Sequence, residues 1–301
     1  MAERPGDATQ RLLPRCTFPP PGTAVTCAVS GGADSLALLV LAVAAGCDVT
    51  AVHVDHALRP GSHLEADVVR DAAERFGAGF RAVRVDVGEG PNLEARARAA
   101  RYAALPVDVL TGHTADDQAE TVMVNLLRGA GASGLAAMRP GPRRPLLALR
   151  RADTVALCEA LGLAVVHDPS NDDPRHLRNR VRHELLPLLD ELARRDLVPV
   201  LIRQADVARD EADLLDELAA ALDPTDARVL AAAPVPLARR AVRRWLTEEH
   251  PPDLATVERV LDVARGLAVG TDLGRGRRVT RHQQRLTLHH GPPWAEGQPT
   301  E

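Results

Sequence analysis

The residues of this sequence with the clearest capacity for chemistry are residues 30–35, which read Ser-Gly-Gly-Ala-Asp-Ser and directly follow an apolar run. Because Gly31 and Gly32 have no Cβ, backbone N–H groups can approach a polyphosphate closely. The hydroxyls of Ser30 and Ser35 add donors, and the N-terminus of the apolar helix expected next adds partial positive charge. The pattern predicts a phosphate-binding loop between a buried strand and a helix.

An acid within this loop sets it apart from the Walker type, since there is no Gly-Lys-Ser or Gly-Lys-Thr and residue 34 is aspartate. Asp34 would repel a bound phosphate unless a cation lay between them, so it is a candidate Mg²⁺ ligand. The alternative is a Gly-rich strand-to-helix turn with a serine N-cap. The density of glycine, serine and acid in six residues favours the phosphate site.

A second set of ionisable residues lies in residues 111–121. His113 follows a predicted strand, and Asp117 and Glu120 are three residues apart on one side of the next helix. Acids near a helix N-terminus often only stabilise its dipole, by about 0.3–1 kcal/mol each. That explanation covers a His–Asp–Glu set at a ligand-binding edge less well, and paired carboxylates there could hold a cationic substrate.

Two earlier segments add polar residues. His53 and His56 follow a predicted strand; either they are a polar strand end or they contact a ligand, and metal binding is disfavoured because the two cannot share one strand face. Arg98 and Arg101 share a helix face, so they form either a solvated surface or a guanidinium clamp on the polyphosphate.

Residues 167–183 combine an acidic turn containing two prolines with a helix that carries Arg178, Asn179 and Arg182. Arginine at this density suits contacts with an RNA backbone, and a solvated basic helix is the alternative. We expect these arginines to act apart from the phosphate loop, so that their loss leaves ATP binding untouched.

The order of the expected elements indicates the fold. Strands and helices alternate with short connections, which predicts a doubly wound parallel α/β sheet with ligands at the carboxyl ends of its strands. Strands are expected at 23–29, 48–54, 80–85 and 107–111, and helices at 36–43, 62–76, 92–105 and 115–127.

The pattern becomes mainly helical after residue 187, with helices expected at 188–222 and 237–266 and a hairpin at 277–281 and 285–288. We therefore expect a smaller, mainly helical C-terminal domain. The expected division is a mobile segment at 1–20, the α/β domain at 21–190, the C-terminal domain with its hairpin at 191–290, and a mobile tail at 291–301.

Composition narrows the class of protein. The formal net charge is −4 and all 37 basic residues are arginine, so no lysine nucleophile exists and phosphate charge must be met by arginine and Mg²⁺. The four scattered cysteines argue for a reducing cytosol and against a zinc or iron–sulfur site. There is no long uncharged apolar run and no apolar signal core, so a cytoplasmic chain without a membrane partner is expected.

The six-residue loop resembles that of the N-type ATP pyrophosphatases, the PP-loop superfamily. Within it, the chain resembles the tRNA(Ile)-lysidine synthetase family through a series of motifs over about residues 23–190. The motifs that carry this resemblance are SGGADS, HVDHALRPGS, LEARARAARY, GHTADDQAET, NLLRGAGASGLAAM, RPLL and DPSNDDPRHLRNRVRHELLPLL. Thr114 stands where the family often has a second histidine.

The resemblance implies an adenine nucleotide α hydrolase-like fold and a ligase that uses ATP and Mg²⁺. The C2 oxygen of the wobble cytidine of the CAU-anticodon isoleucine tRNA would attack the α-phosphate, and L-lysine would then displace AMP. The expected partners are this tRNA, L-lysine and, as an option, a second copy of the chain in a homodimer. The implied roles are ATP binding by Ser30, Gly31, Gly32, Ala33, Asp34, Ser35 and His53; catalysis by Asp34, Arg101 and His113, with Asp34 holding the metal; lysine binding by Asp117 and Glu120; and tRNA binding by Arg128, Arg178, Asn179 and Arg182.

Two other functions stay open at this stage. Another PP-loop ligase or tRNA-modifying enzyme would share the loop, although a small-metabolite ligase would need neither the arginines near residue 180 nor an extra C-terminal domain. A nucleotide-binding module without catalysis would keep the glycines but should lose Asp34 or the set from His113 to Glu120, and this chain keeps both.

Overall fold

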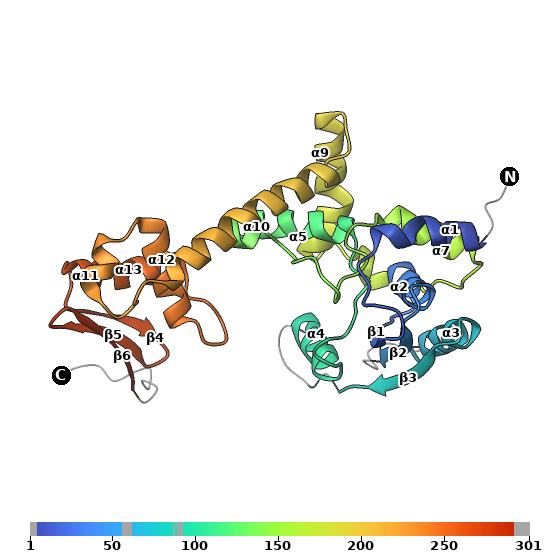
Figure 1. The fold of residues 1–301 in the computed structure, drawn as a ribbon, viewed down its shortest axis with the longest axis horizontal. Coiled ribbons are helices and arrows are strands. Elements are labelled where there is room, and N and C mark those ends of the chain that lie inside the picture. Colours follow the sequence, from blue (N-terminus) through green and yellow to red (C-terminus); the bar gives the residue numbers. More distant parts are fainter. Residues whose placement is uncertain (1–4, 56–61, 87, 89–92, 292–301) are drawn as a thin grey trace. The chain divides into compact units, whose positions relative to one another are not determined.

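The computed structural model describes residues 5–55, 62–86, 88 and 93–291. The chain divides into two compact units between Asp206 and Val207, a boundary that falls inside the long helix α10 (Val198–Ala220) (Figure 1). The predicted loop beyond Asp55 lies outside the described residues as far as residue 61, and so does the predicted tail from residue 292.

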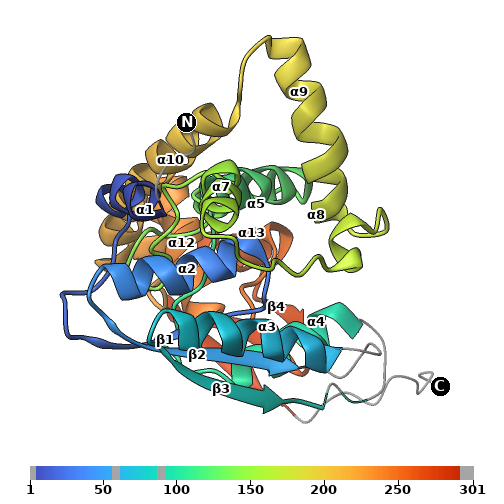
Figure 2. The ribbon, with the colours of Figure 1, turned by 90° about the vertical axis from the view of Figure 1, so that its right-hand side faces the viewer.

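The first unit is built on the predicted parallel sheet. Its strands are β1 (Ala24–Ala28), β2 (Asp48–Asp55) and β3 (Gly79–Arg84), in the order β1-β2-β3. Helices α2 (Ala33–Ala44) and α3 (Ser62–Arg75) lie on one face (Figure 2). The parallel α/β arrangement predicted from the alternation of elements is confirmed.

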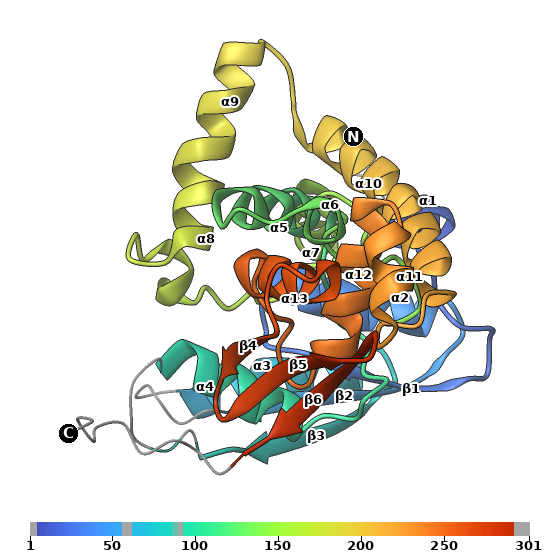
Figure 3. The same ribbon diagram turned by 90° about the vertical axis from the view of Figure 1, so that its left-hand side faces the viewer.

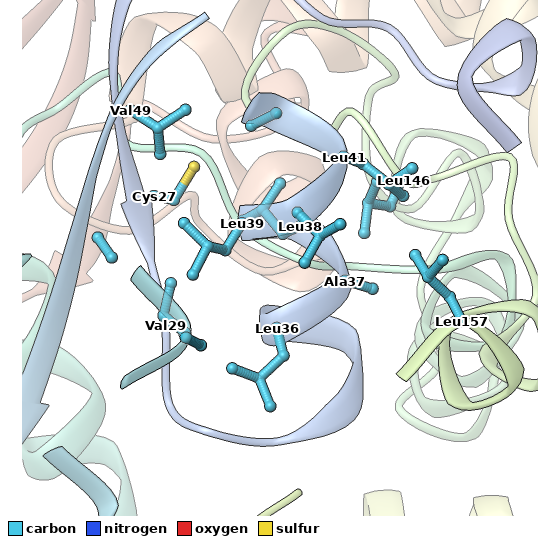
Figure 4. Packing of buried hydrophobic residues seen from close by; sticks show 14 of the residues in the cluster. Cys27, Val29, Leu36, Ala37, Leu38, Leu39, Leu41, Val49, Leu146 and Leu157 are labelled. Atoms are coloured by element: carbon cyan, nitrogen blue, oxygen red, sulfur yellow. The ribbon is translucent and has the colours of Figure 1, made fainter. Parts of the chain in front are cut away.

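Alternate residues of the strands pack on opposite faces, as the two-residue period of a strand requires. Val49 and Ala51 of β2 belong to the main core with Cys27 and the leucines of α2 (Figure 4). Val52 faces the other way and packs with Leu105 and Val109, which follow helix α4 (Leu93–Ala103). The sheet is therefore covered on both faces, which leaves its strand ends for ligands.

The fourth strand predicted at 107–111 is wrong in extent. Only a bridge between Leu110 and Cys27 forms there, with Leu110 N–H donating to the carbonyl of Thr26 over 2.8 Å. The next donor, Thr111 N–H, turns away to the carbonyl of Arg143 at 3.0 Å. Pairing with β1 stops because that hydrogen bond draws the chain toward residue 143.

The expectation of a mobile segment at 1–20 is also wrong where the structure describes it. Helix α1 spans Pro5–Leu12, and Ala8 and Leu12, four residues apart on one helix face, are 2% and 1% exposed in the main core. This burial fixes the segment although prolines 14, 19, 20 and 21 follow it.

The remaining helices of the first unit bring the site residues together. Val181 and Leu186 pack with Ala115, Ala119 and other apolar residues in a separate cluster. The elements are α5 (Ala115–Leu127), α6 (Ala132–Leu135), α7 (Arg151–Ala160), the turn η2 (Pro169–Asp172), α8 (Leu177–Arg180), the π-helical turn η3 (Val181–Leu185) and α9 (Leu186–Ala193), together with the earlier turn η1 (Leu13–Arg15).

The second unit has helices α11 (Ala227–Ala232), α12 (Val235–Leu246) and α13 (Leu254–Arg265) on one face of an antiparallel sheet (Figure 3). The predicted hairpin forms as β5 (Arg277–His282) and β6 (Arg285–His290), and a strand that the sequence pattern missed, β4 (Gly270–Gly274), pairs with β5. None of the helices in the described part of the chain has the length and apolar character of a membrane-spanning segment.

One glycine fixes how closely two site-bearing segments approach. A Cβ on Gly112 would lie 2.6 Å from the backbone oxygen of Asp34 and 2.8 Å from its carbonyl carbon. Because those atoms are backbone at the start of α2, they cannot turn aside as a side chain could. Gly112 therefore lets the segment that carries His113 pass directly against the phosphate loop.

We predict that Gly112→Ala lowers the free energy of unfolding by about 1–3 kcal/mol, the usual cost of overpacking, in urea unfolding followed by circular dichroism. The matched control is Gly131→Ala, where a Cβ would meet nothing within 4 Å and φ is −77°. Equal stability of the two variants would contradict the close approach.

Candidate active site

The phosphate loop has the geometry that its sequence predicts. Gly31 has φ +88°, and Gly32 is the N-cap residue of α2. The Ser35 hydroxyl accepts a hydrogen bond from Ser30 N–H at 3.1 Å and donates one to the Gly32 carbonyl at 2.9 Å. The loop is thus closed by its own serines at a helix N-terminus, where an anion is favoured.

His53 supports this loop from the neighbouring strand. The side chain is 2% exposed, and its Nδ1 lies 3.0 Å from the carbonyl oxygen of Val29, the residue before the loop. The structure places the histidine at the carboxyl end of β2, as predicted, and shows it bonded to the backbone that leads into the loop. Its described contact is therefore one that positions the phosphate loop.

Asp34 lies in the first turn of α2 with its side chain about one quarter exposed, at 26%. The Thr154 hydroxyl donates to one carboxylate oxygen, and Arg151 Nε lies 3.4 Å from the other. Burial raises the pKa of Asp34, although both contacts favour its charged form. The carboxylate is thus desolvated beyond what these two partners offset.

The two acids of α5 meet three arginines. Asp117 Oδ1 accepts hydrogen bonds from Arg151 and Arg178, each at 3.0 Å. Glu120 accepts from Arg151 at 3.0 Å, Arg178 at 2.8 Å and Arg182 at 2.7 Å, and its side chain is 1% exposed. We call Asp34, Asp117, Glu120, Arg151, Arg178 and Arg182 the charge cluster.

The charge cluster corrects one expectation from the sequence. Arg178 and Arg182 were expected to act on RNA apart from the ATP site, yet both hold acids that share Arg151 with Asp34 of the phosphate loop. A residue's position in the chain shows that it is basic but not which acid it meets. The predicted RNA arginines and the predicted lysine acids are therefore parts of one site.

Asn179 holds the turn that precedes α8. Its side-chain amide donates to the carbonyls of Ser170 at 2.8 Å and Asp173 at 3.0 Å. Arg128 is exposed at the carboxyl end of α5, away from the turn that carries Asp117. The RNA roles predicted for these two residues stay predictions.

His113 and Arg101 flank the loop differently. His113 Nδ1 lies 2.8 Å from the hydroxyl of Thr111, and His113 is close enough to Asp117 to contribute to lowering its pKa. The Arg101 guanidinium lies over the ring of Tyr102, 5.6 Å from its centroid. His113 thus stands beside the charge cluster, and the phosphate contact of Arg101 stays a prediction.

Sequence reasoning missed three residues, Arg150, Arg151 and Thr154, at the start of α7. Arg150 bonds Asp116 at 3.0 Å and also reaches Asp196, so Asp116 is an ion-pair partner as well as an acid at a helix N-terminus. A signal was present in the sequence, because two arginines at a helix N-terminus oppose the helix dipole. Such a placement indicates acidic partners elsewhere in the chain.

Electrostatics divide the two aspartates that Arg151 joins. Burial alone would raise the pKa of Asp117, but Arg151 and Arg178 outweigh it and hold the pKa below its usual value. Thr114 assists, because its N–H and hydroxyl both donate to Asp117 Oδ2, at 2.8 and 3.0 Å. Asp117 is therefore a stabilised anion and Asp34 a penalised one.

The sheet, the loop and the charge cluster together define a PP-loop domain. Residues 8–189, more than half of the chain, match the family model described as "PP-loop domain". The U34-tRNA thiolase NcsA from Methanococcus maripaludis shares the fold, with a TM-score of 0.52 at 18% identity over 66% of this chain and 77% of that chain.

Sequence relatives narrow the family further. The tRNA(Ile)-lysidine synthase of Nocardia farcinica is 43% identical over 296 residues, which cover 90% of this chain and 93% of that protein. The enzyme of the same name from Mycobacterium leprae is 40% identical over 88% of this chain and 90% of its own length. This chain belongs to the tRNA(Ile)-lysidine synthase family, which confirms the predicted family and its ligase class.

We predict that the same substitution shifts stability in opposite directions at the two aspartates. Asp34→Asn removes a penalised charge and should raise the free energy of unfolding at pH 7, whereas Asp117→Asn removes a stabilised charge and should lower it. A lowered pKa contributes stability above the unfolded-state pKa, which is lost as the pH falls through the folded-state value.

The measurement is urea unfolding of both variants and the wild type from pH 7 down to pH 3. Asp117→Asn should lack part of the wild type's loss of stability in acid. Destabilisation of similar size by both substitutions at pH 7 would show that the two carboxylates do not differ in the way their surroundings imply.

Proposed function

We propose that this chain ligates L-lysine to C2 of the wobble cytidine in the CAU-anticodon isoleucine tRNA, with conversion of ATP to AMP and pyrophosphate. The observation that carries the proposal is the reach of Arg151, which contacts Asp34 of the phosphate loop and the acid pair Asp117 and Glu120. An anion-binding loop and a cation-binding pair thus adjoin, as a ligase for a nucleotide and an amino acid requires.

In the first step, the cytidine C2 oxygen attacks the α-phosphate of ATP and the bond to pyrophosphate breaks. The backbone of the loop and the N-terminus of α2 would hold the phosphates. The charge that develops falls on phosphate oxygens, so positioning and electrostatics suffice without a protein nucleophile. That agrees with a chain that has no lysine and whose described cysteines are free thiols with raised pKa values at Cys16, Cys27, Cys47 and Cys158.

Asp34 fits the predicted Mg²⁺. Mg²⁺ is usually held by one or two carboxylates together with substrate phosphates and water, and Asp34 is a single, partly exposed carboxylate at the phosphate loop whose burial raises its pKa. A bound Mg²⁺ supplies charge neutralisation at the phosphates. Thr154 and Arg151 would orient the carboxylate for that contact.

In the second step, the ε-amine of lysine attacks C2, AMP leaves with the C2 oxygen, and the amine loses a proton. Asp117 and Glu120 would bind the substrate's ammonium groups in place of arginine donors. The elongator methionine tRNA shares the CAU anticodon, so discrimination against it requires contacts outside the anticodon, where the two tRNAs differ.

The function is tested by incubating the chain with ATP, Mg²⁺, radiolabelled lysine and either the CAU isoleucine tRNA or the elongator methionine tRNA. Lysine incorporation with release of pyrophosphate is expected only with the isoleucine tRNA. Incorporation into neither tRNA would overturn the proposal, and pyrophosphate release with another acceptor would indicate a different ligase.

We predict that Glu120→Gln raises the KM for lysine about tenfold or more, with a much smaller change in the KM for ATP. The reason is the loss of a charge-assisted hydrogen bond, about 1.5–3 kcal/mol. The matched control is Glu184→Gln, since Glu184 pairs with Arg180 at the surface with about half of its side chain exposed. A lysine KM that does not change in Glu120→Gln would remove Glu120 from the lysine site.

A further inference from the structure

The acids proposed to bind lysine are saturated by arginine in this structure. Glu120 Oε1 accepts hydrogen bonds from Arg151 and Arg182, and its Oε2 accepts from Arg178 and Arg182. With 1% of the Glu120 side chain exposed, a substrate ammonium has no path to this carboxylate while the arginines stay. If the proposed function holds, one or more of them must give way.

Charge balance leads to the same conclusion. The charge cluster holds three carboxylates, Asp34, Asp117 and Glu120, against three guanidiniums, Arg151, Arg178 and Arg182. Lysine carries two ammonium groups and one carboxylate. Adding it without an exchange would crowd cations in a partly buried site, whereas stripping Glu120 of donors without a replacement would leave a buried unpaired anion. An exchange of arginine for substrate ammonium keeps the balance.

The positions of the three arginines indicate which ones exchange. Arg151 lies at the start of α7 and also contacts Asp34, so it joins both halves of the site. Arg178 and Arg182 are four residues apart on the short segment α8–η3, so a single displacement moves both. Side-chain exposures of 39% and 24% leave part of each one open to solvent and to a phosphate.

We propose that Arg178 and Arg182 are exchangeable counter-ions that close the lysine pocket until tRNA binds. Phosphates of the tRNA backbone would draw the two guanidiniums off Asp117 and Glu120, since arginine binds phosphate and carboxylate with the same bidentate geometry. The ammonium groups of lysine then take the vacated positions. The inference rests on the proposed function and assigns these arginines to lysine entry as well as to RNA.

Such an exchange makes the two substrates bind cooperatively. If tRNA increases the affinity for lysine by some factor, lysine increases the affinity for tRNA by the same factor. The amine nucleophile would therefore enter mainly when the RNA is in place. The π-helical turn η3 is consistent with this role, because single π turns within helices occur frequently at functional sites.

The test is equilibrium dialysis of radiolabelled lysine against the full chain, with and without the CAU isoleucine tRNA and without ATP. In the wild type, tRNA should lower the Kd for lysine by about tenfold or more, within the usual range of coupled sites. In Arg182→Gln, lysine should bind more tightly without tRNA, and the effect of tRNA should shrink to less than about threefold.

Two further variants make the test specific. Arg180→Gln changes an arginine of the same segment that pairs with Glu184 at the surface, over 3.0 Å, and it should keep the full tRNA effect. Arg182→Lys retains the charge with a single donor group and should show an intermediate effect. Thermal unfolding of each variant establishes that it is folded, and the Lys variant carries the test if the Gln variant is not.

The outcomes separate the two proposals. A wild type that forms lysidine but binds lysine equally well with and without tRNA overturns the exchange and leaves the proposed function standing. Equal tRNA effects in Arg182→Gln and Arg180→Gln also overturn the exchange. A wild type that forms no lysidine with the isoleucine tRNA overturns the proposed function, and the exchange with it.

Discussion

The site depends on the neutralisation of buried carboxylates by Arg151. Its guanidinium contacts Asp34 of α2 and both Asp117 and Glu120 of α5, so it joins acids from two helices that are far apart in sequence. Removing one partner of a buried ion pair typically costs about 3–5 kcal/mol. The start of α7 must therefore lie close to the starts of both α2 and α5, and the crossing at Gly112 brings these segments together.

The same electrostatics separate the tasks of two similar side chains. Asp117 has its charge stabilised by arginines and by the cap at Thr114, whereas Asp34 is desolvated with weaker compensation. A carboxylate that is costly to keep charged is suited to accept a cation from solution. A carboxylate already stabilised by cations is suited to exchange one of them for another. One residue type thus serves two purposes because its surroundings differ.

The sequence predicted the parts of this site that local physics determines. The loop at residues 30–35 and the bounds of α5 follow from glycine, capping and periodicity within a few residues, and the structure agrees with both. It did not predict the partners of Arg178 and Arg182, because their acids lie about 60 residues earlier in the chain. It also missed α1, where prolines obscured the spacing of Ala8 and Leu12, and it extended a strand beyond Leu110 because the competing acceptor at Arg143 is remote.

The π-helical turn η3 has a consequence for the evolution of the segment. An α-helix advances by about 100° per residue, and a π turn accommodates one extra residue between the helical turns on either side of it. Upstream of the turn lies Arg178, which faces the acids, and downstream lies Leu186, which packs in the apolar cluster. Loss of a single residue here would turn one of these faces away from its partner by about a quarter of a circle. The number of residues between the arginine and the leucine is therefore under as much constraint as their identities.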